Sequence, residues 1–189
     1  MMFPLFDENT APEKAKQILA QTKDEFKMIP NLEKTMALAP ALLESYVTCW
    51  NLFDNTSLSP IERQIVYQTA NFENECDYCV PWHTLLAKQV KMSPEDIEAL
   101  RNGAKLTNSR HEALRIFTQS IIRTHGKIAH SELDTFLQAG YTPEQALEVV
   151  LGIAIKTMSN YTNAISGTPL DRTVKSYQWS KPTIKLRKE

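Results

Sequence analysis

Residues 75–83 read Glu-Cys-Asp-Tyr-Cys-Val-Pro-Trp-His, and this stretch carries the most distinctive residue spacing in the chain. It places Cys76 three residues before Cys79, and His83 four residues after Cys79. Side chains three and four residues apart share one face of a helix, so the two thiols and the imidazole are expected along one edge. Two cysteines beside a histidine suit redox chemistry or metal binding, and this stretch alone leaves both alternatives open.

Outward from this stretch, nearly every segment has the apolar spacing of a helix. Helix starts are marked by a Ser or Thr followed by Pro at Ser59-Pro60, Ser93-Pro94 and Thr142-Pro143. Glu62 completes a capping box with Ser59. The helix that begins after Thr142 is apolar over a wide arc, which is typical of a helix that lies centrally or at a subunit interface.

The composition favours an all-α fold in a single domain. The chain of 189 residues contains only 5 glycines, whereas sheet-rich folds need many tight turns. Only Thr183–Leu186 looks strand-like, and it is too short to require a sheet. We therefore expect one helical domain over 1–189, with a core at about 32–171 and a C-terminal tail at 172–189.

Charge and hydropathy exclude several classes of function. The net charge is -1 and no long basic block occurs, which argues against binding to nucleic acid. No apolar run approaches the length that spans a bilayer, and the first residues lack the positive region of a signal peptide. The expected location is cytoplasmic, where the 3 cysteines are unlikely to form a disulfide framework. A Cys-x-x-Cys pair there points to redox chemistry or to a metal.

The start of the helix that carries the cysteines can be placed in two ways. If Asn74 caps it, Cys76 lies just inside the helix N-terminus, where the dipole favours an anion. Pro81 then lies inside the helix and kinks it between Cys79 and His83. If the helix begins later, the kink disappears together with the effect of the N-terminus on Cys76.

The spacing favours the redox alternative over zinc. Cys79 lies one helical turn from His83, which can accept its proton or pair with its thiolate. The resulting hypothesis is that Cys79 attacks an oxidised substrate and Cys76 resolves the product as a Cys76–Cys79 disulfide. Cys76, Cys79 and His83 would supply three zinc ligands, but structural zinc prefers four and no second ligand pair follows. No metal is expected, and without a Gly-rich phosphate loop no bound nucleotide cofactor is expected either.

These residues resemble the AhpD-like, carboxymuconolactone decarboxylase superfamily, and its peroxidase-related members most of all. The likeness lies in Ser59-Pro60-Ile61-Glu62-Arg63, in the stretch from Cys76 to His83, in Asn160-Tyr161-x-Asn163 and in Pro169-Leu170-Asp171. The resemblance implies an AhpD-like helical fold and a homo-oligomer, commonly a trimer or hexamer. It also implies thiol-dependent reduction of a peroxide or a disulfide. An external dithiol, such as a lipoyl or thioredoxin-like protein, would regenerate the thiols, and a peroxiredoxin is a further implied partner.

Besides Pro81, the sequence departs from the family pattern at Gln64 and at Tyr78. Gln64 stands where the family has its proton-relay glutamate, and an amide cannot take up a proton. Either the activity is weaker, or Glu62, Glu73 or Glu75 serves instead. Tyr78 lies between the cysteines where the founding member has histidine, and its phenol can donate a hydrogen bond.

The sequence leaves two alternatives to peroxide reduction open. Gln64 favours a thiol-disulfide exchange partner without direct peroxidase activity. The alternative from another class is a non-enzymatic helical protein whose Cys-Cys-His cluster holds zinc or only packs.

Overall fold

The structure, a computed structural model, describes residues 3–182, and it contains helices but no strand within that range. The all-α prediction is confirmed, while Thr183–Leu186 lies outside the described residues. In chain order the elements are α1 (Glu13–Phe26), α2 (Asn31–Met36), α3 (Pro40–Asp54), α4 (Pro60–Glu73), α5 (Cys79–Gln89), α6 (Pro94–Asn102), α7 (Ser109–Thr124), α8 (His130–Gln138), α9 (Pro143–Ser166) and the 3-10 helix η1 (Arg172–Tyr177).

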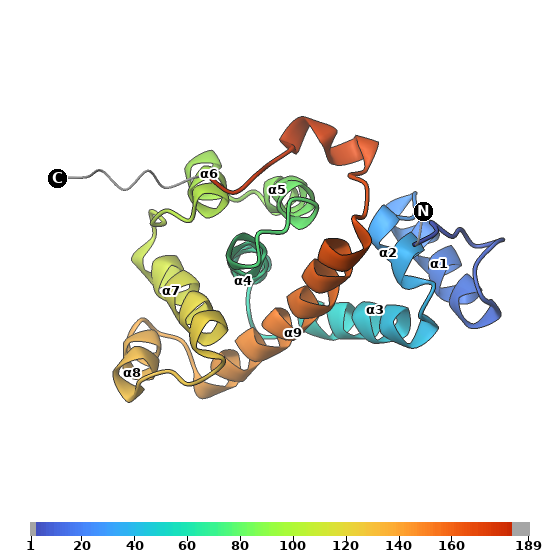
Figure 1. The fold of residues 1–189 in the computed structure, drawn as a ribbon. Coiled ribbons are helices and arrows are strands. Elements are labelled where there is room, and N and C mark those ends of the chain that lie inside the picture. The colour runs from blue at the N-terminus through green and yellow to red at the C-terminus, as the bar shows by residue number, and fades with distance from the viewer. Residues whose placement is uncertain (1–2, 183–189) are drawn as a thin grey trace.

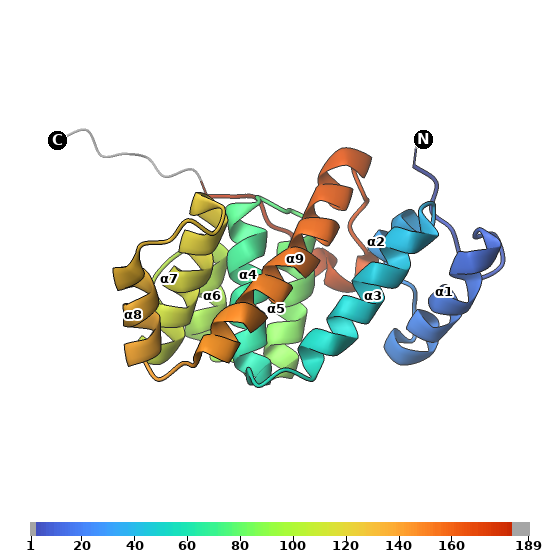
Figure 2. The same ribbon diagram turned by 90° about the horizontal axis from the view of Figure 1, so that it is seen from below.

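Helix α4 lies at the centre of the molecule. It packs against α5, α6, α7 and α9, and every residue from Gln64 to Phe72 is buried. In Figures 1 and 2, α4 and α5 lie between a group formed by α6, α7 and α8 and a second group formed by α1, α2 and α3. Helix α9 runs from the first group to the second, so it contacts both α4 and α3. One core therefore connects helices from both ends of the chain.

The predicted start signals of α4 and α9 are confirmed by their hydrogen bonds. The Ser59 hydroxyl accepts the N–H of Glu62, and the Glu62 carboxylate accepts the N–H of Ser59. Thr142 and Gln145 form the same capping box at the start of α9. These caps satisfy backbone N–H groups that have no partner inside the helix, which fixes where each helix begins.

The helix that carries the cysteines begins later than Asn74. Asn74 is the C-terminal cap of α4, and the assigned helix α5 begins at Cys79. The Cys76 carbonyl accepts the N–H of Val80 at 3.1 Å, and the Cys76 sulfur accepts the N–H of Cys79 at 3.2 Å. Cys76 therefore caps the first turn from outside the helix, and an Asn74 cap is wrong. Pro81 falls in the first turn of α5, where a missing N–H is tolerated.

Both ends of the described chain contribute to the packed interior. Leu19 of α1 and Val174 of η1 are fully buried, and Trp179 is 8% exposed against Phe72. The sequence-based limits at 32 and 171 therefore do not mark the edges of the packed region. The segment after Asp171 packs on α5, next to the cysteines.

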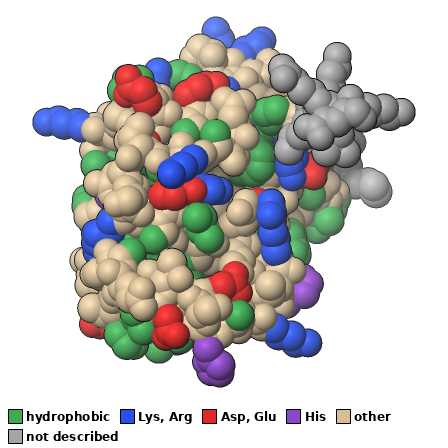
Figure 3. Space-filling model, turned by 90° about the vertical axis from the view of Figure 1, so that its left-hand side faces the viewer, with side chains coloured by type: hydrophobic (Ala, Val, Ile, Leu, Met, Phe, Trp, Pro, Cys, Tyr) green, Lys and Arg blue, Asp and Glu red, His purple; other side chains and the backbone are tan. Residues whose placement is uncertain are grey.

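The surface is mixed in charge where Figure 3 displays it. Acidic and basic side chains are interspersed on that face. Helix α9 differs, because one of its faces carries the exposed apolar side chains Leu147, Val150, Tyr161 and Ile165. Among the described helices, none is both long and apolar enough to cross a membrane.

Candidate active site

The two thiols lie at the junction of α4, α5 and α9 and are reduced. Cys76 is 5% and Cys79 2% exposed. The side-chain amide of Asn163 donates to both sulfurs, with Nδ2 3.2 Å from Cys79 Sγ and 3.7 Å from Cys76 Sγ. A single donor thus contacts both sulfurs, which places them on the same side of the turn between α4 and α5.

Helix α9 presents a row of buried polar side chains to this junction. Lys156, Ser159, Asn160 and Asn163 are all buried, and their spacing places them on one face of the helix. The Asn160 amide donates to Asn71 at 2.9 Å, and its carbonyl accepts from Asn74 at 3.0 Å. These bonds fasten α9 to the end of α4 immediately before the cysteines.

His83 lies between Gln64 and Lys156. Its Nδ1 is 2.8 Å from Oε1 of Gln64, and its Nε2 is 2.9 Å from Nζ of Lys156. A lysine ammonium can only donate, so Nε2 is the acceptor and Nδ1 carries the hydrogen that Gln64 accepts. Burial and the Lys156 charge hold the pKa of His83 well below its ordinary value. The imidazole is therefore neutral.

The predicted pairing of His83 with Cys79 does not appear in these contacts, since both ring nitrogens have other partners. Residues 3–182 also contain no group of three or more His, Cys, Asp and Glu side chains arranged to hold a metal. The ammonium of Lys156 next to His83 would moreover repel a cation placed on the imidazole.

The two thiols differ in how readily they ionise. Burial alone would raise the pKa of Cys79, but the Cys76 hydrogen bond, the Lys156 charge and the Asn163 amide together lower it to about 6. For Cys76, the hydrogen bond with Cys79 and burial both raise the pKa. Cys79 is therefore the thiolate at neutral pH and Cys76 the thiol.

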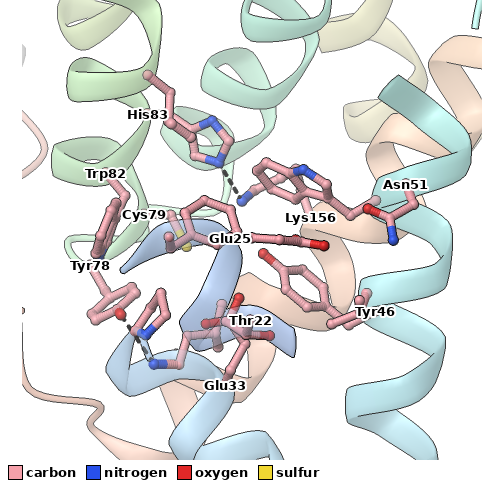
Figure 4. Close-up of a pocket in the computed structure, with 16 residues that line it drawn as sticks. Thr22, Glu25, Glu33, Tyr46, Asn51, Tyr78, Cys79, Trp82, His83 and Lys156 are labelled. Atoms are coloured by element: carbon pink, nitrogen blue, oxygen red, sulfur yellow. Dashed lines mark hydrogen bonds between the residues drawn. The ribbon is translucent and has the colours of Figure 1, made fainter. Parts of the chain in front are cut away.

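A pocket leads from the surface to Cys79 (Figure 4). Its volume is about 60 Å³, and its walls are mainly aromatic and aliphatic side chains from α1, α3 and α5. Tyr46, Trp50 and Trp82 form much of the wall, while Glu33 and Lys156 are ionisable groups that line it. At ~10–15 Å³ per water, the space holds a few waters or a small substrate.

Tyr78 fixes the turn between the cysteines. Its hydroxyl donates to Asp171 and accepts the backbone N–H of Leu32 at 3.0 Å. The same carboxylate accepts from the indole of Trp82 at 3.0 Å and from the N–H of Asn31 at 3.2 Å. Tyr78 thus has a positioning role, and it ties the cysteine turn to α2 and to the segment before η1.

Residues 40–118 match the sequence model of the carboxymuconolactone decarboxylase family. This match covers less than half of the chain, and together with the fold it supports the AhpD-like, carboxymuconolactone decarboxylase superfamily. The matched segment contains Gln64, Cys76, Cys79 and His83, whereas Lys156 lies outside it. A comparison with curated proteins gives no match.

Solved structures share the fold of this chain at low sequence identity. An uncharacterized peroxidase-related protein with an alkylhydroperoxidase AhpD core, from Ralstonia eutropha JMP134, has a TM-score of 0.81 and 18% identity, covering 91% of this chain and 93% of that chain. An uncharacterized peroxidase-related protein from Silicibacter sp. TM1040 has a TM-score of 0.77 and 18% identity, covering 92% of each chain. A Cys-to-Ala variant of the debrominase Bmp8 in complex with 2,3,4-tribromopyrrole has a TM-score of 0.75 and 15% identity, covering 93% and 94%.

The three glutamates proposed as substitutes for the family's relay glutamate all lie away from Cys79. Glu73 pairs with Arg123 at 2.7 Å, and Glu75 is exposed and pairs with Lys181 at 3.1 Å. Glu62 is occupied by its capping box and by Arg110. None of the three lines the pocket beside Cys79. Gln64 itself lies beside His83, as the family pattern implies.

Sequence reasoning missed Lys156 and Glu33. Asn163 was already within the C-terminal part of the resemblance, and Lys156 lies on the same face of α9 two turns before it. The signal was the spacing of Lys156, Ser159, Asn160 and Asn163 inside an otherwise apolar helix. Glu33 gives no comparable signal, because α2 is short and its burial depends on tertiary packing.

Proposed function

We propose that this protein is an enzyme that reduces peroxides through Cys79 and cycles through a Cys76–Cys79 disulfide. The observation that supports it is the placement of Cys79 at the wall of a pocket, within 3.2 Å of the Asn163 amide, with Cys76 in contact with the same amide. A stabilised thiolate with a second thiol beside it and space for a small oxidant is what this chemistry requires.

The proposed cycle balances without a bound cofactor. The Cys79 thiolate attacks the terminal oxygen of a hydroperoxide and becomes a sulfenic acid, while the O–O bond breaks and the other oxygen takes up a proton and leaves as an alcohol. The Cys76 thiol then attacks the Cys79 sulfur, which forms the disulfide and releases water. An external dithiol returns two electrons to the pair. Both sulfurs are buried, so a slender donor such as a lipoyl arm reaches them more readily than a folded thioredoxin-like protein does.

Lys156 supplies the positive charge that stabilises the thiolate in this cycle. His83 accepts a hydrogen bond from its ammonium and is itself fixed by Gln64. Gln64 can hold this orientation although it cannot carry a proton. Gln64 and His83 are thus positioning residues for a charged lysine, which accounts for an amide at the family's relay position.

A homo-oligomer is part of the proposal. The exposed face of α9 carries Leu147 at 73%, Tyr161 at 59% and Ile165 at 72% exposure. Apolar side chains aligned along one long helix are typical of a contact surface. We propose that a second copy of the chain covers this face.

The test uses anaerobically reduced protein in a Cys49→Ser background, so that only Cys76 and Cys79 react. Cumene hydroperoxide, a small disulfide and a bromopyrrole are each mixed with this protein in separate reactions. The bromopyrrole is included because the structurally similar Bmp8 is a debrominase. Thiol loss is followed with time, and the Cys76→Ser variant is trapped with dimedone for mass spectrometry. We expect the hydroperoxide to react and the trapped adduct to lie on Cys79.

Other outcomes separate the alternatives. Reduction of the disulfide with no loss of peroxide would identify the chain as a thiol-disulfide exchange partner. Loss of bromide from the bromopyrrole alone would place its chemistry with the debrominase. If none of the three is consumed and Cys76→Ser changes only stability, the enzyme proposal fails.

A further inference from the structure

The pocket contains a second ionisable group with no evident structural role. Glu33 of α2 is 7% exposed and lines the same pocket as Cys79 (Figure 4). Its Oε2 atom is buried and has no hydrogen-bond partner among the described residues. Burying a carboxylate oxygen without a partner is costly, so a Glu33 that contributes only to packing would be unfavourable.

The charges around Glu33 keep it protonated. Burial raises its pKa most, and the carboxylates of Asp171 and Glu25 raise it further, while a hydrogen bond from the backbone N–H of Glu33 and the charge of Lys156 lower it. The balance raises the pKa of Glu33 to about 8. Tyr46, which faces the same space, also has a raised pKa because of burial and the nearby acids, so it stays neutral. Glu33 therefore presents an O–H donor to the pocket at neutral pH.

We propose that Glu33 is the general acid that protonates the leaving oxygen when the Cys79 thiolate attacks a peroxide. This inference rests on the proposed peroxide reduction and assigns one of its steps. Glu33 comes from α2, outside the segment that matches the family.

The step balances in atoms and charge. The thiolate takes the terminal OH of the hydroperoxide to give the sulfenic acid, and the O–O bond breaks. The departing alkoxide receives the Glu33 proton and leaves as the alcohol, and Glu33 becomes a carboxylate. Water restores its proton after the alcohol leaves. The charge of the thiolate thus ends on Glu33.

Cys79 and Glu33 line one pocket, and their pKa values are shifted in opposite directions. This is the pattern of a nucleophile paired with a general acid. The Cys79 pKa is lowered and the Glu33 pKa is raised. An acid that is neutral at working pH can donate a proton to an alkoxide, which is a far stronger base. Gln64 has no proton to supply to it.

The experiment compares three reagents on Glu33→Gln, which keeps the shape and removes the acid. The leaving group of tert-butyl hydroperoxide is an alkoxide, which needs a proton. The leaving groups of peracetic acid and iodoacetamide are acetate and iodide, which depart without one. We expect oxidation of Cys79 by tert-butyl hydroperoxide to slow by about 10²-fold or more. The rates with peracetic acid and iodoacetamide should stay unchanged. The decline of the wild-type rate above pH 8 should disappear in the variant.

Two further variants make the result specific. Glu44→Gln removes an exposed acid of α3 that does not line the pocket, and it should react like wild type. Glu33→Asp keeps a carboxyl and should retain the decline at high pH. The proposal is overturned if Glu33→Gln reacts with tert-butyl hydroperoxide at the wild-type rate, or if all three reagents slow equally. A wild-type protein that reacts with peracetic acid and iodoacetamide but with no hydroperoxide would overturn the proposed function as well.

Discussion

The Nζ atom of Lys156 lies 2.9 Å from Nε2 of His83, and the imidazole accepts the hydrogen bond. Both residues are almost completely buried, Lys156 at 1% and His83 at 2% exposure. A buried ammonium requires a neighbour that carries negative charge or accepts its hydrogens. His83 meets part of that need, and the Cys79 thiolate supplies the opposite charge. The lysine thus takes the place beside the nucleophile that the sequence assigned to histidine.

Lys156→Met should make Cys79 a weaker acid. Removing the ammonium removes one of the causes that lower the thiol's pKa to about 6, so the pKa rises. We expect alkylation of Cys79 by iodoacetamide at pH 6 to slow by about tenfold for each unit of increase in pKa. The measurement is the alkylation rate from pH 5 to 10 in the Cys49→Ser background. Lys88→Met, an exposed change on α5, is the control, and an unshifted profile in Lys156→Met would contradict the prediction.

The fold was predictable because its start signals are local. Ser59 and Thr142 each form a capping box with a residue within one turn, and this pattern marks the start of their helices. Apolar spacing identifies most of the other helices. The site was only partly predictable. Cys79 and His83 lie one turn apart on α5 and line the same pocket, as helix geometry predicted, although their side chains do not pair. Lys156 lies 73 residues from His83, and no local sequence pattern predicts the hydrogen bond between the two side chains.

The start of α5 shows why the boundary near the cysteines was ambiguous. Asn74 is a good cap residue in general, but its side chain instead donates to Asn160 of α9 at 3.0 Å. The cap of the first turn is Cys76, whose sulfur is an unusual acceptor for a backbone N–H. Tertiary contacts thus overrode the local preference.

Glu33 should make the stability of the protein fall as pH rises. In the unfolded chain its carboxyl ionises near pH 4.5, whereas in the folded protein its pKa is about 8. Between these values only the folded state holds the proton, so this group lowers the free energy of unfolding by about 1.4 kcal/mol per pH unit. Below pH 4.5 both states are protonated and the loss vanishes.

Glu33→Gln does not titrate and should avoid this loss. We expect the difference in unfolding free energy between variant and wild type to grow in favour of the variant from pH 4.5 to 8. Urea unfolding at a series of pH values measures it, with Glu44→Gln, an exposed change on α3, as the matched control. A difference that stays constant with pH would show that Glu33 is not held neutral in the folded state.

Asp171→Ala should destabilise the protein strongly. The carboxylate accepts from the Tyr78 hydroxyl, the Trp82 indole and the Asn31 N–H. Its removal leaves these buried or partly buried donors without a partner, at a cost of about 3 kcal/mol or more in the free energy of unfolding. Chemical denaturation measures the change, and Asp134→Ala, an exposed change on α8, is the control. A loss no larger than that of Asp134→Ala would contradict the role assigned to Asp171.

Ile165→Glu should dissociate the proposed oligomer without unfolding the subunit. Ile165 is 72% exposed at the end of α9, so a charge there is harmless in an isolated subunit and costly in a contact. Light scattering after size-exclusion chromatography gives the mass, and circular dichroism reports the helix content. Ile116→Glu places the same charge on α7, where the isoleucine is 47% exposed, and should leave the mass unchanged. Equal masses for wild type and Ile165→Glu would exclude this face as the contact.

The anchoring of Tyr78 has a consequence for biosynthesis. Its hydroxyl bonds to the Leu32 backbone, which leaves the ribosome before the cysteines, and to Asp171, which leaves long after them. A nascent chain therefore contains both thiols well before the turn between them is fastened. Asn163 and Lys156 also emerge late, so the thiolate has no stabilising partners in that interval. Cys79 would thus remain a poorly reactive thiol during synthesis and gain its acidity only when the last helix docks, which protects the unfinished chain from oxidation.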